Sequence, residues 1–210
     1  PEIGALLMRS TWIEDIRTWH APYPNDDGMS LLEDLLEPLS QSKSRLGIMK
    51  GHETSLRMPL GDYEKLTSKL PGINFVDATN IIRNLRMIKS DAEIEKIEYI
   101  CNIVSRTFEK AVELFYKGQP LDEAFRVFRI ECLKQGADEV PYLVGGAENG
   151  GYRDIISPPT NRPLASGDIL MFDTGATYDG YFCDFDRNFS IGKADENSMR
   201  AYDTLWNATE

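Results

Sequence analysis

The sequence predicts a mixed α/β chain, of the α+β type, and three patterns lead to that class. Over residues 1–84, short apolar runs alternate with segments of helical periodicity. Two segments between residues 90 and 136 carry helix start and stop signals, and two apolar and aromatic runs between residues 169 and 191 flank Asp179-Gly180. Alternating strands and helices favour some parallel pairing, whereas two runs joined by a tight turn indicate an antiparallel hairpin.

The first 84 residues have the pattern strand, helix, strand, helix, strand. We expect strands at residues 3–8, 46–49 and 73–76, the last one after the Pro71-Gly72 breaker. Helices are expected at residues 31–39 and 63–70, where leucines recur at helical spacing. The segment 20–28 is rich in turn-forming residues and is expected to be an exposed loop.

A second unit begins near residues 88–90. Ser90 and Glu93 have the spacing of a capping box, and the apolar stripe behind them predicts a long helix over residues 90–117 that ends at Gly118. A second helix opens at Pro120 and closes at Gly136. The glycine-containing stretch 145–150 is expected to be a loop, and the hairpin follows it.

The hairpin carries three aspartates whose register follows from the turn. With Asp179-Gly180 at the tip, Gly175 lies opposite Asp184, and Asp173 lies opposite Asp186. Because side chains alternate with period two, all three carboxylates project from one face, where opposed and diagonal neighbours lie close together. Carboxylates gathered on one buried face repel each other unless a cation or a shared proton neutralises them.

Two interpretations of this face remain open at the level of sequence. Aspartates in a hairpin often lie on a solvated face, but the flanking aromatic residues, Phe172, Tyr181, Phe182, Phe185 and Phe189, indicate a covered sheet. If a cation binds, oxygen ligands favour Mn, Mg or Fe(II), with Zn or Co when imidazole joins. Arg187 is an accessory candidate, either as a counter-charge or clamp for a substrate carboxylate or as part of a surface ion pair.

Composition excludes several classes of partner. The chain has 23 Lys and Arg against 34 Asp and Glu, a net charge of −11, which argues against nucleic acid or an anionic membrane surface as a partner. No apolar run approaches the roughly 20 residues that a bilayer requires. Cys101, Cys132 and Cys183 form no CxxC pair, which favours a reducing, cytoplasmic location. The chain starts at Pro1 and stops in a helical pattern, so we expect it to be a piece of a longer protein.

At the hairpin the chain resembles the pita-bread metallopeptidase family, which includes aminopeptidase P, prolidase and creatinase. The family pattern is Asp-x-Gly, a second Asp eleven positions after the first, and, two residues after that Asp, Thr or Ser followed by Arg; Asp173-Thr174-Gly175, Asp184 and Arg187 fit it. Ser166-Gly167-Asp168 resembles the turn before the metal-bearing strand, and residues 85–90 resemble the inter-domain linker. The resemblance implies part of a creatinase-type amino-terminal α/β domain over residues 1–84 and the first half of a pita-bread catalytic domain over residues 85–210.

The same resemblance implies a metal-dependent hydrolase of the Xaa-Pro aminopeptidase or dipeptidase kind. Two divalent ions, Mn with Co, Zn or Fe as alternatives, would activate a water against an amide bond. Asp173 would bind one ion, and Asp184 would bridge both. The remaining family ligands, one His and two Glu, are expected beyond residue 210, so the 210-residue piece alone is expected to be inactive. The resemblance also implies a homodimer and a peptide or small-molecule amide as substrate.

Two positions depart from the peptidase pattern. Ile156 stands where aminopeptidase P and prolidase carry a histidine, and the only histidines of the chain are His20 and His52. Asp186 replaces the Thr or Ser and adds a third carboxylate. The alternatives are a non-peptidase pita-bread enzyme (a lyase or small-molecule amidohydrolase) and a catalytically incomplete binding module. Glu148 and Asn149 resemble a loop near the substrate pocket of aminopeptidase P, and an ordinary turn is expected about as readily.

Overall fold

The chain divides after Ile88 into two units, each with its own core, in a computed structural model that describes residues 2–156 and 158–209. The amino-terminal unit contains α1 (Glu2–Ser10), α2 (Met29–Gln41), β1 (Arg45–Ile48), α3 (Leu60–Lys69), β2 (Asn74–Asp77) and α4 (Thr79–Met87). The second unit contains α5 (Asp91–Glu109), α6 (Ala111–Leu114), α7 (Leu121–Gln135), β3 (Glu139–Asn149), β4 (Asp168–Tyr178), β5 (Tyr181–Ser190) and α8 (Glu196–Thr209). The mixed α/β class predicted from the sequence is confirmed.

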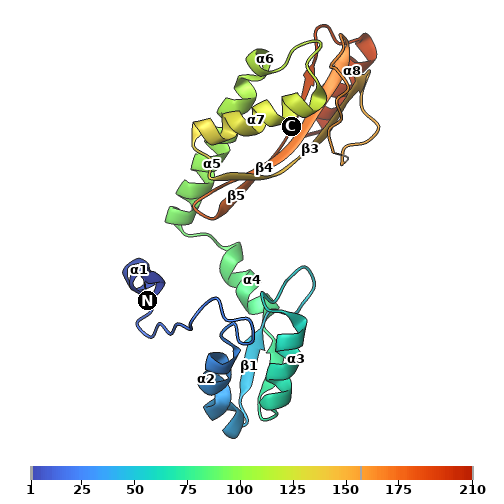
Figure 1. Ribbon diagram of the computed structural model, residues 1–210. Coiled ribbons are helices and arrows are strands. Elements are labelled where there is room, and N and C mark those ends of the chain that lie inside the picture. The colour runs from blue at the N-terminus through green and yellow to red at the C-terminus, as the bar shows by residue number, and fades with distance from the viewer. Residues whose placement is uncertain (1, 157, 210) are drawn as a thin grey trace. The chain divides into compact units, whose positions relative to one another are not determined.

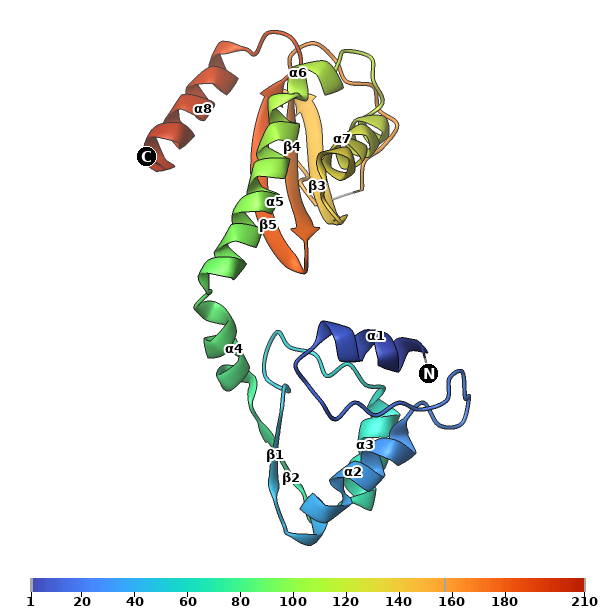
Figure 2. The ribbon, with the colours of Figure 1, turned by 90° about the vertical axis from the view of Figure 1, so that its left-hand side faces the viewer.

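In the amino-terminal unit, β1 and β2 pair in parallel, with Leu46 opposite Phe75 (Figure 2). The helix α2 and the helix α3 carry their leucines toward a small core formed by Leu36, Leu66, Leu70 and Ile73. An ion pair of 2.6 Å between Lys69 and Glu33 joins the two helices at the surface. The two parallel strands and both helices agree with the sequence prediction.

The prediction of a strand at residues 3–8 is wrong, because this segment belongs to the helix α1. A short apolar run fits a buried strand and a helix equally well, and Ala, Leu and Met are strong helix formers. Leu6 and Met8 are 58% and 60% exposed, so the run is not a core strand. The helix α4 also lies in a segment where no helix is predicted from the sequence.

In the second unit, α5 and α7 pack on one face of the antiparallel sheet β3-β4-β5, in which β5 is an edge strand (Figure 1). The predicted capping box is present, since Ser90 and Glu93 close the amino-terminal end of α5. Phe128 of α7 joins both neighbours, with its ring centroid 4.7 Å from that of Phe108 on α5 and 5.2 Å from that of Phe172 on β4. This aromatic cluster fixes the helices on the sheet face opposite the aspartates.

The long helix predicted over residues 90–117 is interrupted. The helix α5 ends at Glu109, Lys110 separates it from the short α6, and Phe115 is already extended. Near the break, the Thr107 hydroxyl donates to the carbonyl oxygen of Ile103 at 3.0 Å, a bond that weakens and bends a helix. The predicted second helix is confirmed as α7, which ends at Gly136 in the left-handed conformation.

The loop predicted at residues 145–150 is also wrong, because residues up to Asn149 belong to β3. Gly145 and Gly146 do not form a turn. They lie inside the strand, where the absence of a side chain allows other backbone segments to approach closely. A Cβ on Gly145 would lie 2.0 Å from the carbonyl oxygen of Met171, and one on Gly146 would lie 2.7 Å from that of Asp154. The chain turns only at Gly150 and Gly151, both of which have positive φ.

The last helix, α8, has no buried residue, and an apolar stripe of Met199, Tyr202, Leu205 and Trp206 is exposed along it. Within the described parts of the chain, no helix combines the length and the apolar character that a membrane span needs.

Candidate functional site

The predicted register of the hairpin is confirmed. Gly175 pairs with Asp184 and Asp173 pairs with Asp186, and the turn residues Asp179 and Gly180 both have positive φ, as the tight turn requires. The intervening residues Phe172, Thr174 and Ala176 are buried against the helices. By strand alternation, the three aspartates therefore lie together on the face that α5 and α7 do not cover. Asp173 is half-buried there, whereas Asp184 and Asp186 are exposed.

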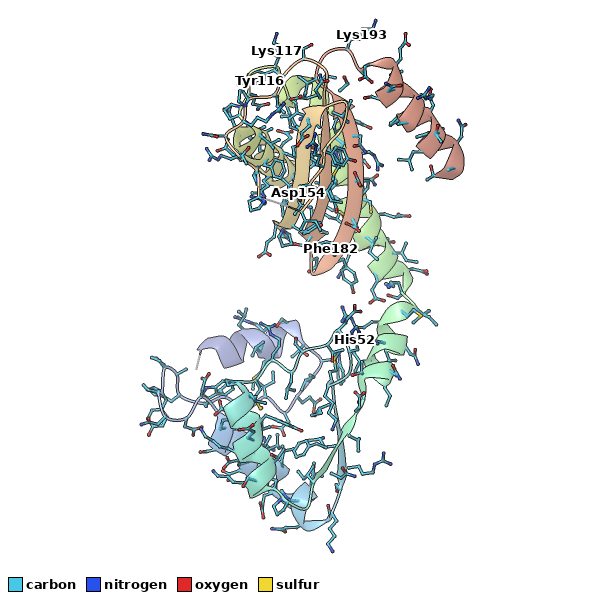
Figure 3. All side chains as sticks on the ribbon, turned by 90° about the vertical axis from the view of Figure 1, so that its right-hand side faces the viewer. His52, Tyr116, Lys117, Asp154, Phe182 and Lys193 are labelled. Atoms are coloured by element: carbon cyan, nitrogen blue, oxygen red, sulfur yellow. The ribbon has the colours of Figure 1, made fainter. Side chains whose placement is uncertain are left out.

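Gly175 has a steric role on this face. A Cβ built on it would lie 1.8 Å from Cζ of Phe182, so the ring of Phe182 lies directly over the glycine backbone. Phe182, which is labelled in Figure 3, is 49% exposed, and its ring covers Gly175, the β4 residue directly opposite Asp184. The glycine of the Asp-x-Gly motif is thus required for close approach of an aromatic side chain.

Tyr142 of β3 is a member of the site that the sequence did not identify. Its hydroxyl donates a hydrogen bond of 3.0 Å to Oδ2 of Asp173. That bond is the main reason that the pKa of Tyr142 is raised, so the phenol stays protonated as the donor. Finding Tyr142 from sequence would have required the pairing of β3 with β4, which the mistaken loop at residues 145–150 concealed.

The three carboxylates are close enough to affect one another. Although the Asp186 side chain is exposed, loss of part of its hydration and then the negative charge of Asp173 raise its pKa, and Asp184 acts in the same direction. The Arg187 guanidinium opposes that shift. Arg187 nevertheless starts from the opposite face of β5, donates to the backbone carbonyl oxygen of Asp186 at 2.7 Å, and lies 5.2 Å from the ring centroid of Phe185. Its proposed accessory role stays a prediction.

The weaker candidates lie further along the same sheet. Glu148 pairs with Ile169 and Asn149 pairs with Asp168, so both end the strand β3 and do not belong to a loop. Glu148 forms an ion pair of 3.6 Å with Arg153. Ile156 is 74% exposed, and its backbone N–H donates to Oδ1 of Asp154. His52 lies in the loop that follows β1 in the amino-terminal unit (Figure 3).

Asp168 anchors the beginning of β4. It is fully buried and accepts two bonds from Arg162, at 2.7 and 3.0 Å, as well as one of 2.7 Å from the backbone N–H of Ala165. The Arg162 guanidinium holds the pKa of Asp168 below its usual range. The family-like Ser166-Gly167-Asp168 turn therefore has a structural function, which is to fix the strand that carries Asp173.

Cys183, next to Asp184, faces the core and not the site. Its Sγ lies 3.9 Å from the carbonyl oxygen of Ile100, and burial raises the pKa of its thiol. Cys101 of α5 is close enough to Cys183 to affect its pKa, although the two are far apart in sequence. All three cysteines are free thiols.

The aspartates fit a hard divalent cation by donor chemistry, because they offer clustered carboxylate oxygens and no thiolate. They do not complete a site by themselves. Among the described residues, no three or more His, Cys, Asp or Glu side chains are arranged so that they could hold a metal ion. Asp173 and Asp184 therefore match part of a coordination sphere.

The parallel α/β unit, followed by a helix-backed hairpin with carboxylates on its open face, defines an architecture of creatinase type. Residues 5–88 match the creatinase/prolidase N-terminal domain. Residues 95–210 match metallopeptidase family M24, and the chain belongs to that family.

Curated relatives and solved structures agree with this assignment. The chain is 28% identical over 160 residues to an Xaa-Pro dipeptidase of Pyrococcus horikoshii, covering 75% of this chain and 44% of the relative. It is 29% identical over 138 residues to the probable dipeptidase PepE of Mycobacterium tuberculosis, covering 65% of this chain and 36% of the relative. The chain thus spans less than half the length of these relatives.

Two solved structures share the fold over nearly the whole chain. A recombinant prolidase from Thermococcus sibiricus superposes with a TM-score of 0.78 at 20% identity, covering 99% of this chain and 54% of that one. An X-Pro aminopeptidase from Thermotoga maritima superposes with a TM-score of 0.76, also at 20% identity and with the same coverage. At this identity the likeness establishes the fold.

Proposed function

We propose that the protein to which this chain belongs is a metal-dependent hydrolase that cleaves Xaa-Pro bonds in dipeptides or at the amino end of peptides. The observation that carries the proposal is the placement of Asp173 and Asp184 at family spacing on one open face of the β4–β5 hairpin. Membership of a metallopeptidase family and relatives named as Xaa-Pro dipeptidases support it.

In this proposal the carboxylates of Asp173 and Asp184 would hold the divalent metal. When bound, the metal makes a water nucleophilic near neutral pH and polarises the amide carbonyl. Asp186 adds negative charge beside the ligands, and the ring of Phe182 covers Gly175, which lies opposite Asp184. The resemblance to the family implies that one His and two Glu would complete the site.

The direct test is metal binding by the complete protein that carries this chain. Asp184→Asn should lower the number of Mn²⁺ ions bound per chain, because a neutral amide is a weaker ligand for a hard cation than a carboxylate. Asp179→Asn is a matched control, since Asp179 lies at the hairpin tip and pairs with Lys96. An unchanged stoichiometry in Asp184→Asn would contradict the assignment.

A second candidate keeps the metal and changes the reaction to that of a lyase or a small-molecule amidohydrolase. It is favoured by Ile156, an exposed aliphatic side chain at the position where the peptidases have a histidine. Turnover of a panel of Xaa-Pro dipeptides, with matched Xaa-Ala dipeptides as the control, separates the candidates. Brisk, proline-dependent turnover supports the peptidase and excludes the alternative.

A third candidate is a binding module without catalysis, which is consistent with the incomplete donor set of the described residues. It predicts the same melting temperature with and without EDTA and no uptake of Mn²⁺. Measured uptake at a stoichiometry that depends on Asp184 excludes it.

Several finer features belong to the same proposal. We propose two Mn²⁺ ions, with Co, Zn or Fe as alternatives, a homodimer and a cytoplasmic location; the three free thiols are consistent with that location. We also propose a domain boundary between residues 84 and 85, which is supported by the division into two units after Ile88. Metal analysis and light scattering test the metal and the dimer, and limited proteolysis tests the boundary.

A further inference from the structure

Tyr142 on β3 contacts Asp173 on the neighbouring strand β4. It lies directly opposite Gly175 in the register of β3 with β4, and Asp173 precedes Gly175 by two residues on β4. Its phenol therefore spans a diagonal pair, a separation that an aromatic side chain can bridge. The irregularity of β3 between Glu139 and Tyr142 sets this register, and bulges commonly re-aim a side chain next to a functional site.

The residues directly opposite Tyr142 and Asp173 have no side chain that could donate a hydrogen bond to Asp173 in place of Tyr142. Val144, the residue directly opposite Asp173, has an aliphatic side chain, and Gly175 has no side chain. In the part of the chain that the structure describes, no other side chain donates a hydrogen bond to Asp173. A carboxylate turns easily about its last torsion angle, so this single bond determines how its oxygens are presented.

We propose that Tyr142 is a positioning residue for Asp173: by holding Oδ2, its hydroxyl orients the carboxylate toward the side of Asp184 and Asp186, where a divalent cation would bind. The inference rests on the proposed metal-dependent function. Outer partners that orient a ligand commonly change metal affinity by about 10–100-fold when they are removed. Because Tyr142 is 38% exposed, we expect a value near the lower end of that range, about 10-fold.

The test is Tyr142→Phe in the complete protein, with Mn²⁺ affinity measured by titration calorimetry. Tyr181→Phe is the matched control, because Tyr181 donates a bond of the same 3.0 Å length to a carboxylate, that of Glu93, which lies outside the aspartate cluster. We expect Tyr142→Phe to weaken Mn²⁺ binding about 10-fold and Tyr181→Phe to leave it unchanged. The visible spectrum of the Co²⁺-loaded protein should shift in Tyr142→Phe alone, which a purely structural role would not cause.

Tyr142→Met also lacks the hydroxyl donor and should weaken Mn²⁺ binding to the same extent. It takes the place of Tyr142→Phe if the circular dichroism spectrum of Tyr142→Phe differs from that of wild type. If wild type binds Mn²⁺ and a folded variant binds it equally or more tightly, the positioning role is wrong and the proposed function stands. If wild type binds no divalent metal, the proposed function fails and this inference fails with it.

Discussion

The buried pair of Asp168 and Arg162 gives the sharpest prediction for stability. Asp168→Asn removes the charge and turns an amide group toward the guanidinium. Removing one partner of a buried pair costs about 3–5 kcal/mol. The Arg162 side chain is 39% exposed and can recover some hydration, so we expect the lower end, about 3 kcal/mol. For a unit of this size that corresponds to a fall in melting temperature of about 12 °C.

Asp179→Asn provides the comparison for a thermal melt followed by circular dichroism. Asp179 also forms a short ion pair, 2.6 Å from Lys96, but the two side chains are 61% and 37% exposed. Such surface pairs contribute about 0–1 kcal/mol. If Asp168→Asn and Asp179→Asn have the same melting temperature, the view that the pair of Asp168 and Arg162 anchors β4 is refuted.

The difference in stability between wild type and Asp168→Asn should depend on pH in a definite direction. Arg162 lowers the pKa of Asp168 in the folded chain, so the unfolded chain takes up a proton first as the pH falls. The stabilisation is therefore fully present above the ordinary pKa of aspartate, about 4, and is lost as the pH falls through the lowered value. The difference in melting temperature between wild type and Asp168→Asn should therefore become smaller under acid conditions.

Three further predictions concern the hairpin and the core. Gly175→Ala should destabilise the chain by about 1 kcal/mol in urea denaturation, because the new methyl group displaces the ring of Phe182, and the loss should disappear in a Phe182→Ala background. Burial raises the pKa of Cys132 to about 11, so iodoacetamide at pH 8 should leave Cys132 unmodified in the native chain and alkylate it in urea; alkylation of the native chain would contradict the burial. Because Asp173 contributes to the raised pKa of Asp186, Asp173→Asn should lower that pKa in a carboxyl NMR titration, and an unchanged value would show that the two carboxylates are not coupled.

Local signals predicted much of the second unit correctly. Asp179-Gly180 specifies a two-residue turn, and the turn alone determines which residues face each other along the hairpin. Ser90, Glu93 and Gly136 mark helix ends through hydrogen bonds that involve only near neighbours in sequence. These features needed no knowledge of the rest of the chain.

The errors occurred where distant segments decide the structure. Gly145 and Gly146 of β3 led to the prediction of a turn, because the sequence does not show that the backbones of Met171 and Asp154 lie against them. The hydrogen bond from Tyr142 to Asp173 spans 31 residues, and the contact between Cys101 and Cys183 joins a helix to a strand. Residues 3–8 fit a helix and a strand equally well, and periodicity could not decide between them.

The edge position of β5 has a consequence for solubility. Among the described residues this ten-residue strand pairs with β4 as its only neighbouring strand, so its outer backbone groups can template the addition of another chain. Asp184 and Asp186 oppose that reaction, because a second copy arriving at the edge would bring like charges together. Acidification that protonates Asp186 removes part of this protection, and self-association of the chain should therefore increase toward low pH.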